Sequence, residues 1–208
     1  MKIGIYAGTF DPIHNGHINF AKNAVKFTAL DKVVIVAEKN PYRKKPHATW
    51  DHRQAMIERA TENIVEADHD YEFSNKLSHQ FTMQNMLQGA RDHYGVDHEF
   101  WFLVGSDIFE HIQRWQNIVK EHEYGGFIVA LRDNHTQAWL NDKIAYLRLS
   151  GFNINVQLIV NHKPHISSRL IREQLLGHNL PNELSPRVYE YMLQHSLYDI
   201  EDAYDILK

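Results

Sequence analysis

Five short apolar runs, each followed by a segment with helical periodicity, constrain the fold of this chain more than any other feature. The runs are IGIYAG (residues 3–8), KVVIVA (32–37), EFWFLVG (99–105), GGFIVALR (125–132) and NINVQLIV (153–160). KVVIVA is apolar throughout rather than at alternate positions, which is typical of a strand covered on both faces of a parallel sheet. Strands that alternate with helices therefore predict an α/β fold with a Rossmann-like, doubly wound parallel sheet.

The segments between and after these runs have the apolar spacing of helices. In residues 16–30, Ile18, Ala21, Ala24 and Val25 share one helix face. Further helices are predicted at residues 51–64, with Asp51 as the N-cap, and at 80–95, 106–119, 137–149, 167–178 and 186–196. Because no repeat, low-complexity tract or linker interrupts the pattern, residues 1–208 are predicted to form a single domain that ends in C-terminal helices.

The composition excludes several kinds of chemistry. The chain has 208 residues and no cysteine, so disulfides, thiolate metal sites and thiol nucleophiles are excluded. A formal net charge of −4 disfavours broad binding to nucleic acid or an acidic membrane, but it leaves room for local phosphate sites. No run of about 18 apolar residues occurs, and the opening segment lacks the long apolar centre of a signal peptide. A cytoplasmic protein is the expectation.

Two histidines, His14 and His17, lie in the sequence GTFDPIHNGH, where the first strand gives way to the first helix. A zinc site needs at least a third ligand, and no H-E-x-x-H pattern accompanies the pair, so metal ligation is disfavoured. One remaining interpretation is structural: Asn15 caps the helix and both histidines lie on its first turn. The other is phosphate binding, because a helix N-terminus attracts anions and the imidazoles and the Thr9 hydroxyl add donors.

Three unusual segments follow the ends of predicted strands, namely AGTFDPIHNGH, VGSDIFEHIQRW and NHKPHISSRLIR. Ligands of open α/β sheets bind beyond the carboxyl ends of the strands, so these segments are expected to surround one site. No G-x-x-x-x-G-K-[ST] pattern occurs, and no G-x-G-x-x-G follows the first strand. The site is therefore neither a P-loop nor the usual dinucleotide fingerprint.

Two of these segments carry a resemblance to a known family. GTFDPIHNGH and ISSRLIR, about 150 residues apart, resemble the two signatures of the nucleotidyltransferase superfamily, G-T-F-D-P-x-H-x-G-H and I-S-S-T-x-I-R. Within it the chain is similar to the bacterial nicotinate-nucleotide adenylyltransferase family, also through NPYRKKPH, SHQFTMQNML, FLVGSDIFEHIQRW and LPNELSPRVYEYMLQHSLY. Together these stretches cover nearly the whole chain.

The resemblance implies a reaction in NAD biosynthesis. The phosphate of nicotinate mononucleotide attacks the α-phosphorus of ATP in line, without a covalent enzyme intermediate, and gives deamido-NAD and pyrophosphate. An ionised phosphate is already a nucleophile, so catalysis consists of positioning and charge stabilisation. The implied cofactor is Mg²⁺, held mainly by ATP oxygens rather than by protein ligands.

The first signature carries part of the implied site. By resemblance, Thr9, His14 and His17 contact the ATP phosphates, with His17 nearest the α-phosphate. Gly8 and Phe10 supply backbone at the nucleotide. His14 and His17 are therefore expected to be catalytic, together with Arg172 of the second signature.

The second signature carries the rest of the phosphate site. A helix start at Ser167 and Ser168, together with Arg172, is implied to hold the β- and γ-phosphates, which suits the several donors of arginine. The plainer interpretation is a helix cap and a solvated arginine. Arg169 departs from the family pattern, which has threonine there, and Ala7 stands where the subfamily more often has glycine.

Two further segments are implied to bind ATP. A basic residue of the NPYRKKPH loop faces the phosphates, and Lys44 is the expected one, although Arg43 and Lys45 are alternatives. Gly105 and Asp107 match the G-x-D segment on the adenosine side. The alternatives from the residues alone are a solvated charge run and a helix-capping Asp.

The resemblance also implies that Thr82, Met83 and Trp115 bind the acceptor substrate, nicotinate mononucleotide. Thr82 and Met83 lie where the family recognises the nicotinate carboxylate through backbone amides at a helix start. Trp115 matches a tryptophan on which the pyridinium ring stacks, an attraction akin to cation–π. Taken alone, this tryptophan is equally compatible with the core.

Other functions stay open at this point. An adenylyltransferase for nicotinamide mononucleotide or phosphopantetheine belongs to the same superfamily, although phosphopantetheine enzymes normally have threonine at the position of His14. Cytidylyltransferases share the first signature, but HISSRLIR differs from their usual second one, R-T-x-G-I-S-T. A non-catalytic nucleotide-binding relative is compatible with Arg169. The expected partners are small molecules, ATP and nicotinate mononucleotide, with no nucleic acid or membrane partner; a homo-oligomer is compatible with the sequence.

Overall fold

A six-stranded parallel sheet forms the centre of the protein, in a computed structural model that describes residues 1–41, 44–77, 82–114, 124–132, 135–159, 166–177 and 181–199. The sheet order is β3-β2-β1-β4-β5-β6, and every neighbouring pair is parallel. The strands are β1 (Lys2–Gly8), β2 (Lys32–Ala37), β3 (Ala67–His69), β4 (Glu99–Gly105), β5 (Gly126–Ala130) and β6 (Val156–Ile159). The predicted doubly wound α/β fold is confirmed.

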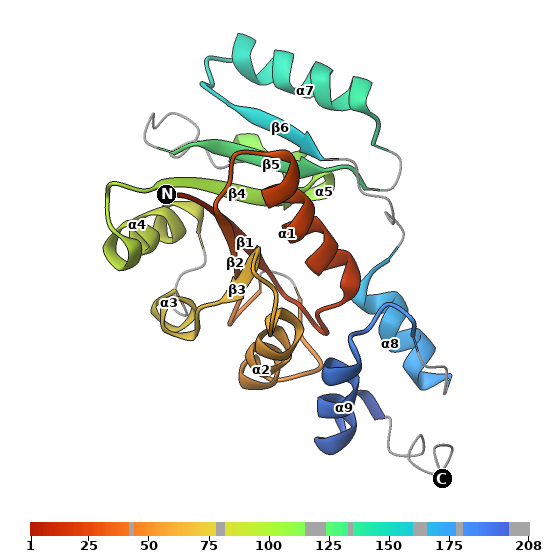
Figure 1. Cartoon of the computed structure of the whole chain (residues 1–208). Helices are drawn as coiled ribbons and strands as arrows, with labels where there is room; N and C mark the ends of the chain where they lie inside the picture. Colours follow the sequence, from red (N-terminus) through yellow and green to blue (C-terminus); the bar gives the residue numbers. More distant parts are fainter. Residues whose placement is uncertain are drawn as a thin grey trace.

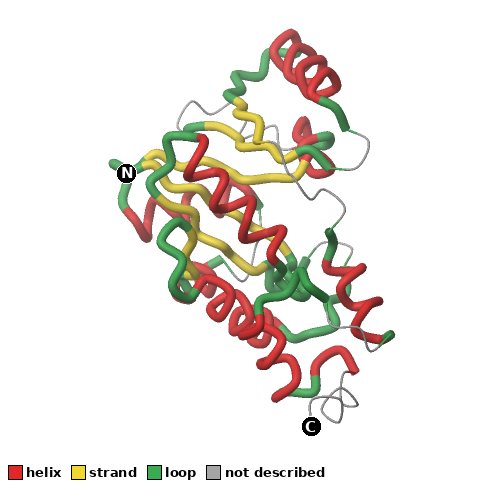
Figure 2. The backbone as a smooth tube through the Cα atoms, turned by 45° about the vertical axis from the view of Figure 1, so that its right-hand side comes forward, coloured by secondary structure: helices red, strands yellow, loops and turns green. Residues whose placement is uncertain are grey.

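Helices cover both faces of the sheet (Figures 1 and 2). They are α1 (Asn15–Phe27), α2 (Trp50–Thr61), α3 (Tyr71–Lys76), α4 (Met83–Tyr94), α5 (Ser106–Phe109), α7 (Gln137–Leu149), α8 (Ser168–Leu176) and α9 (Pro186–Gln194), with 3₁₀ turns η1 (Ile112–Arg114) and η2 (Leu197–Asp199). One apolar layer joins the sheet to α1, α2, α8 and α9, and the other joins it to α3, α4 and α7. Successive strand residues such as Val33 and Val34 enter opposite layers, which explains the continuous apolar run.

Several boundaries differ from the sequence prediction. The N-cap of α2 is Thr49, whose hydroxyl accepts a hydrogen bond from the His52 backbone N–H (3.4 Å), so the prediction of Asp51 as cap is wrong. Asp51 lies in the first turn instead, where its charge is favourable. The helix predicted at 106–119 is broken into α5 and η1, and residues 115–119 lie outside the described part. The elements β3 and α3 were not predicted.

The sheet order fixes where a ligand can bind. The chain runs from β1 outward to β2 and β3, and then returns to place β4 on the other side of β1. The carboxyl ends of β1 and β4 thus flank the switch point at which open α/β sheets bind ligands. In the described residues, no helix is both long and apolar enough to span a bilayer.

Candidate active site

The loop after β1 is folded back on itself by an aromatic contact. Phe10 has a φ of 49°, and its buried ring packs edge-on against Tyr6 and His17, with centroid distances of 5.3 and 5.0 Å. A Cβ atom at Gly8 would lie 3.1 Å from the Phe10 ring, closer than such atoms usually approach. Gly8 is therefore the residue that lets the loop close over the end of β1.

His14 and His17 form a buried, stacked pair at the start of α1. Their ring centroids lie 3.6 Å apart with an interplanar angle of 24°, and the residues are 4% and 8% exposed. The His14 backbone N–H donates to Nδ1 of His17 (3.2 Å), so in the neutral ring the proton is on Nε2. Nδ1 of His14 is buried without a hydrogen-bond partner among the described residues, which leaves a polar atom for a ligand.

The capping arrangement differs from the structural interpretation of the sequence. His14, with extended backbone angles, is the N-cap of α1, so the expectation that Asn15 caps the helix is wrong. The Asn15 backbone N–H donates instead to the carbonyl of Glu183 (2.7 Å). A Cβ atom at Gly16 would lie 2.9 Å from Nδ1 of His14, so the glycine makes room for the stacked imidazole.

Both imidazoles are held neutral. Burial, and then the charge of Arg132, lowers the pKa of His14 to about 3. Burial, with the nearby His14, Arg132 and Lys44, holds the pKa of His17 well below its usual value. The positive charges of Arg132 and Lys44 near the rings favour a polyphosphate anion, whose own charge would then favour protonation of the rings.

Arg132 is a site residue that the sequence analysis missed. It lies two residues beyond β5, and a Cβ atom at Gly105 would be 2.9 Å from its Nε and 2.2 Å from Oδ1 of Asp107. Gly105 therefore allows Arg132 and Asp107 to converge at the end of β4. The sequence does contain a signal for it, because Arg132 is the one charged residue of the predicted strand GGFIVALR and stands at its carboxyl end.

The second signature contacts the first directly. The Ser168 hydroxyl donates to the carbonyl of Pro12 (2.8 Å). Arg172 donates through Nη1 to the carbonyl of Asp11 and lies 3.7 Å from Oδ2 of the same residue. Ser167 caps α8 by accepting from the Leu170 backbone N–H (3.2 Å). The structure thus brings the two predicted segments to one place.

Arg169, the departure in the second signature, lies away from this contact. Its Nε pairs with Glu173 one turn later (2.8 Å), and its side chain is 82% exposed. An exposed pair of this kind contributes little. The substitution therefore leaves the contact between the two signatures in place.

A second residue that the sequence analysis missed, Arg53, holds the loop after β1 in place. It lies on α2 and is 1% exposed. Its guanidinium donates to the carbonyl oxygens of Thr9 (2.6 Å) and Glu38 (2.7 Å). A buried arginine whose donors are used on backbone carbonyls rigidifies the segment it holds, and here that segment contains Thr9.

The basic loop contributes one described cation near the histidines. Lys44 is exposed, and its charge is among the causes that lower the pKa of His17. Arg43 lies outside the described residues, and Lys45 is exposed with no contribution to either histidine. This geometry favours Lys44 within the described part of the loop.

The structure describes three of the remaining predicted site residues, Asp107, Thr82 and Met83, but not Trp115. Asp107 lies exposed in the first turn of α5. Thr82 is the N-cap of α4 and accepts from the Asn85 backbone N–H (3.2 Å), with Met83 as the first helical residue. The helix start implied for carboxylate recognition is therefore present. Trp115 lies outside the described residues, and its stacking role stays a prediction.

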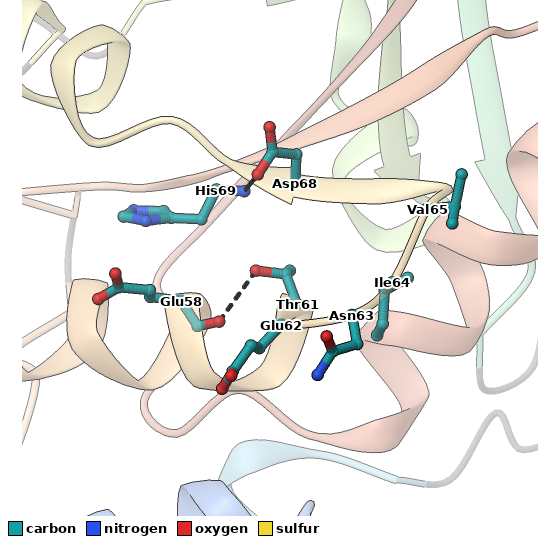
Figure 3. A pocket seen from close by; sticks show the side chains of 8 residues that line it. All are labelled: Glu58, Thr61, Glu62, Asn63, Ile64, Val65, Asp68 and His69. Carbon is teal, nitrogen blue, oxygen red and sulfur yellow. Dashed lines mark hydrogen bonds between the residues drawn. The ribbon is translucent and has the colours of Figure 1, made fainter.

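A separate open pocket lies between the end of α2 and β3 (Figure 3). It is lined by Glu58, Thr61, Glu62, Asn63, Ile64, Val65, Asp68 and His69. Its polar groups are partly used within the fold: the Thr61 hydroxyl donates to the Glu58 carbonyl (3.2 Å), and Glu62 pairs with Arg187. None of the predicted site residues lines this pocket, so the loop after β1 remains the candidate site.

Comparison with known proteins identifies one family model and several relatives that match most of this chain. A family model described as cytidylyltransferase-like matches residues 5–174. A Flavobacterium johnsoniae protein named probable nicotinate-nucleotide adenylyltransferase is 31% identical, over 95% of this chain and 99% of its own. A Neisseria meningitidis protein with the same name is 30% identical, over 95% and 98% of the two chains.

Solved structures share the fold. The nicotinic acid mononucleotide adenylyltransferase of Plasmodium falciparum, complexed with NaAD, superposes with a TM-score of 0.74 at 22% identity and covers 96% of this chain and 98% of its own. The same enzyme complexed with APC gives 0.71 over the same shares of the chains. At this identity the likeness shows a common fold.

Proposed function

This chain belongs to the cytidylyltransferase-like family, and we propose that within it the chain is an adenylyltransferase that joins nicotinate mononucleotide to ATP in NAD biosynthesis. The products are deamido-NAD and pyrophosphate. Relatives that align over nearly the whole chain and carry the name of this activity support the assignment.

One observation carries the proposal more than any other. Ser168 and Arg172 of the second signature contact Pro12 and Asp11 of the first, although some 150 residues separate them in sequence. Both signatures of the superfamily therefore form a single site, beside a pair of neutral imidazoles at the N-terminus of α1.

The residues support a mechanism by positioning. A phosphate oxygen of the mononucleotide forms a bond to the α-phosphorus of ATP, and the bond from that phosphorus to the bridging oxygen of the pyrophosphate breaks. The Nε2 N–H of His17 would donate a hydrogen bond to an oxygen on which charge increases, and Arg172 and Lys44 would add positive charge. No general base is needed because the attacking phosphate is already ionised.

Mg²⁺ is the proposed cation, and it supplies charge neutralisation for the polyphosphate. Within the described residues no three His, Asp or Glu side chains come together as a metal cage. Imidazoles and cations lie at the loop, the Asp11 carboxylate is occupied by hydrogen bonds from His47, Ala48 and Tyr198, and Asp107 is exposed on α5. Such residues fit a Mg²⁺ that is carried by ATP oxygens and water.

The proposal also includes how the nicotinate group is recognised and where in the cell the protein acts. The start of α4 at Thr82 and Met83 would accept the nicotinate carboxylate through backbone N–H groups, with Trp115 stacking on the ring. The partners are small molecules, the expected location is the cytoplasm, and no nucleic acid or membrane is involved. A homo-oligomer is compatible with this function.

Pyrophosphate release tests the assignment. The purified chain, with ATP and Mg²⁺, is incubated separately with nicotinate mononucleotide, nicotinamide mononucleotide and phosphopantetheine. We expect release mainly with the first. Turnover with only one of the other two would move the substrate within the superfamily, and no release with any acceptor would favour a non-catalytic nucleotide-binding protein.

A further inference from the structure

The C-terminal part of the described chain returns to the candidate site through an unusual turn. After α9, Ser196 and Tyr198 have φ values of 48° and 63°, a left-handed conformation that side-chain-bearing residues rarely adopt. The turn brings the Tyr198 hydroxyl to Oδ1 of Asp11, to which it donates a hydrogen bond of 2.8 Å. A strained turn that ends in a partly buried hydrogen bond indicates that this contact matters to the folded state.

Asp11 connects four segments of the chain. It is 4% exposed, and its carboxylate accepts from the backbone N–H groups of His47 (2.8 Å) and Ala48 (3.0 Å) and from Tyr198. The His47 ring lies 3.4 Å from Oδ2. Arg172 lies 3.7 Å from the same oxygen and donates to the Asp11 carbonyl.

In this arrangement the Asp11 carboxylate and a bound phosphate would compete for hydrogen bonds from the Arg172 guanidinium. A buried carboxylate with too few donors attracts the nearest guanidinium strongly. Burial alone would raise the pKa of Asp11, but the His47 and Ala48 backbone bonds, the Tyr198 hydroxyl and the Arg172 charge lower it instead. With three short donors already on the carboxylate, Arg172 stays at 3.7 Å and keeps donors for another anion.

We propose that Tyr198 is a positioning residue, which acts through Asp11 to keep Arg172 available to the ATP phosphates. The inference rests on the proposed function for its substrate. Tyr198 touches no reacting atom in this account. It supplies the donor that would otherwise have to come from Arg172.

Tyr198→Phe removes the donor and keeps the ring. We expect Arg172 to move toward Asp11, so that the KM for ATP rises roughly three- to tenfold while the KM for nicotinate mononucleotide stays within about twofold. Tyr191→Phe is the matched control, because Tyr191 is also a buried tyrosine of the C-terminal segment and its hydroxyl contacts His52 (2.9 Å), not Asp11. This control should change melting temperature without changing the KM for ATP.

A double-mutant cycle separates positioning from a general structural effect. Tyr198→Phe, Arg172→Lys and the double variant are compared at a temperature at which circular dichroism shows all of them folded. If Tyr198 acts through Arg172, the ATP effect of Tyr198→Phe is much smaller in the Arg172→Lys background. The same factor in both backgrounds, or an equal rise of KM in Tyr191→Phe, would overturn the proposal.

Calorimetric binding of a non-hydrolysable ATP analogue keeps this test independent of the reaction. If the unsubstituted chain binds the analogue but releases no pyrophosphate with any acceptor, the proposed function fails, and the analogue affinities still test the role of Tyr198. If the chain turns over and Tyr198→Phe binds the analogue and ATP normally, the role of Tyr198 fails and the function stands.

Discussion

The imidazoles of His14 and His17 stack at 3.6 Å and are both held neutral in the absence of a ligand. The two rings are buried next to the positive charge of Arg132 and are therefore not an exposed helix start. They form a site whose missing charge is negative, and Nδ1 of His14 has no described partner within the fold.

Replacement of His17 by alanine should lower turnover by a factor of about 10²–10³, because the hydrogen-bond donor that we propose for the developing phosphate charge is lost. Steady-state pyrophosphate release measures the change. His98→Ala is the control, since this histidine lies just before the amino end of β4, at the opposite edge of the sheet, and should leave turnover unchanged. A near-normal rate in His17→Ala would contradict the catalytic role.

Stability should fall as the pH decreases below about 6.5. The pKa of His14 is about 3 in the folded chain and that of His17 is also depressed, whereas an unfolded histidine has a pKa of about 6.5. Between these values the unfolded state binds more protons, so the stability present above pH 6.5 is lost on acidification. The low pKa of His14 should cost about 1.4 kcal/mol at pH 5.5, and His17 should act in the same direction.

Urea unfolding of the unsubstituted chain and of His17→Asn at pH 7 and pH 5.5 measures this effect. The variant should lose less stability than the unsubstituted chain over that interval, because it lacks one of the two histidines with a lowered pKa. Equal losses in the two proteins would show that His17 is not held neutral in the folded state.

Arg132→Ala should raise the pKa of both histidines, because the Arg132 charge contributes to lowering both. Turnover should fall about tenfold or more with the loss of positive charge near the phosphates. Histidine ring NMR resonances followed through a pH titration measure the first effect. Arg132→Lys retains the charge without the planar fork and should preserve the histidine titration; unchanged pKa values in Arg132→Ala would contradict the account.

Arg169→Thr restores the residue that the family pattern has, and it should change turnover by no more than about twofold. The side chain is exposed and paired with Glu173, and surface substitutions of this kind usually have small effects. Arg172→Ala is the contrast and should raise the KM for ATP at least about tenfold. A loss in Arg169→Thr comparable with that in Arg172→Ala would mean that Arg169 reaches the nucleotide.

Strong periodicity made most of the fold predictable, and weak local signals account for what was missed. The five apolar runs all form strands, but β3 is a three-residue edge strand that contains Asp68 and His69, so its sequence has no apolar run. The helix α3 begins immediately after it and depends on Asp70, which accepts from the Phe73 backbone N–H (2.8 Å). Neither element is long enough to show a period.

The site was predictable only where a motif exists. Both signatures identified the loop after β1 and the start of α8, and Ser168 and Arg172 of the second signature make the contact between them. The roles of Arg53 and Tyr198 were missed, although Tyr198 ends the resembling stretch LPNELSPRVYEYMLQHSLY. Arg53 has the sequence appearance of a solvated charge on a helix, and Tyr198 contacts Asp11 across 187 positions. Tertiary folding brings these contacts together, so no local pattern could reveal them.

Transfer of the α-phosphorus tests the central claim most directly. The chain is incubated with Mg²⁺, nicotinate mononucleotide and ATP labelled with ³²P at the α-position, and the products are separated. The account predicts that the label enters deamido-NAD, that one pyrophosphate forms per dinucleotide, and that Arg172→Ala and His17→Ala both slow the transfer. Label that stays in ATP, or that reaches AMP without forming the dinucleotide, would contradict it.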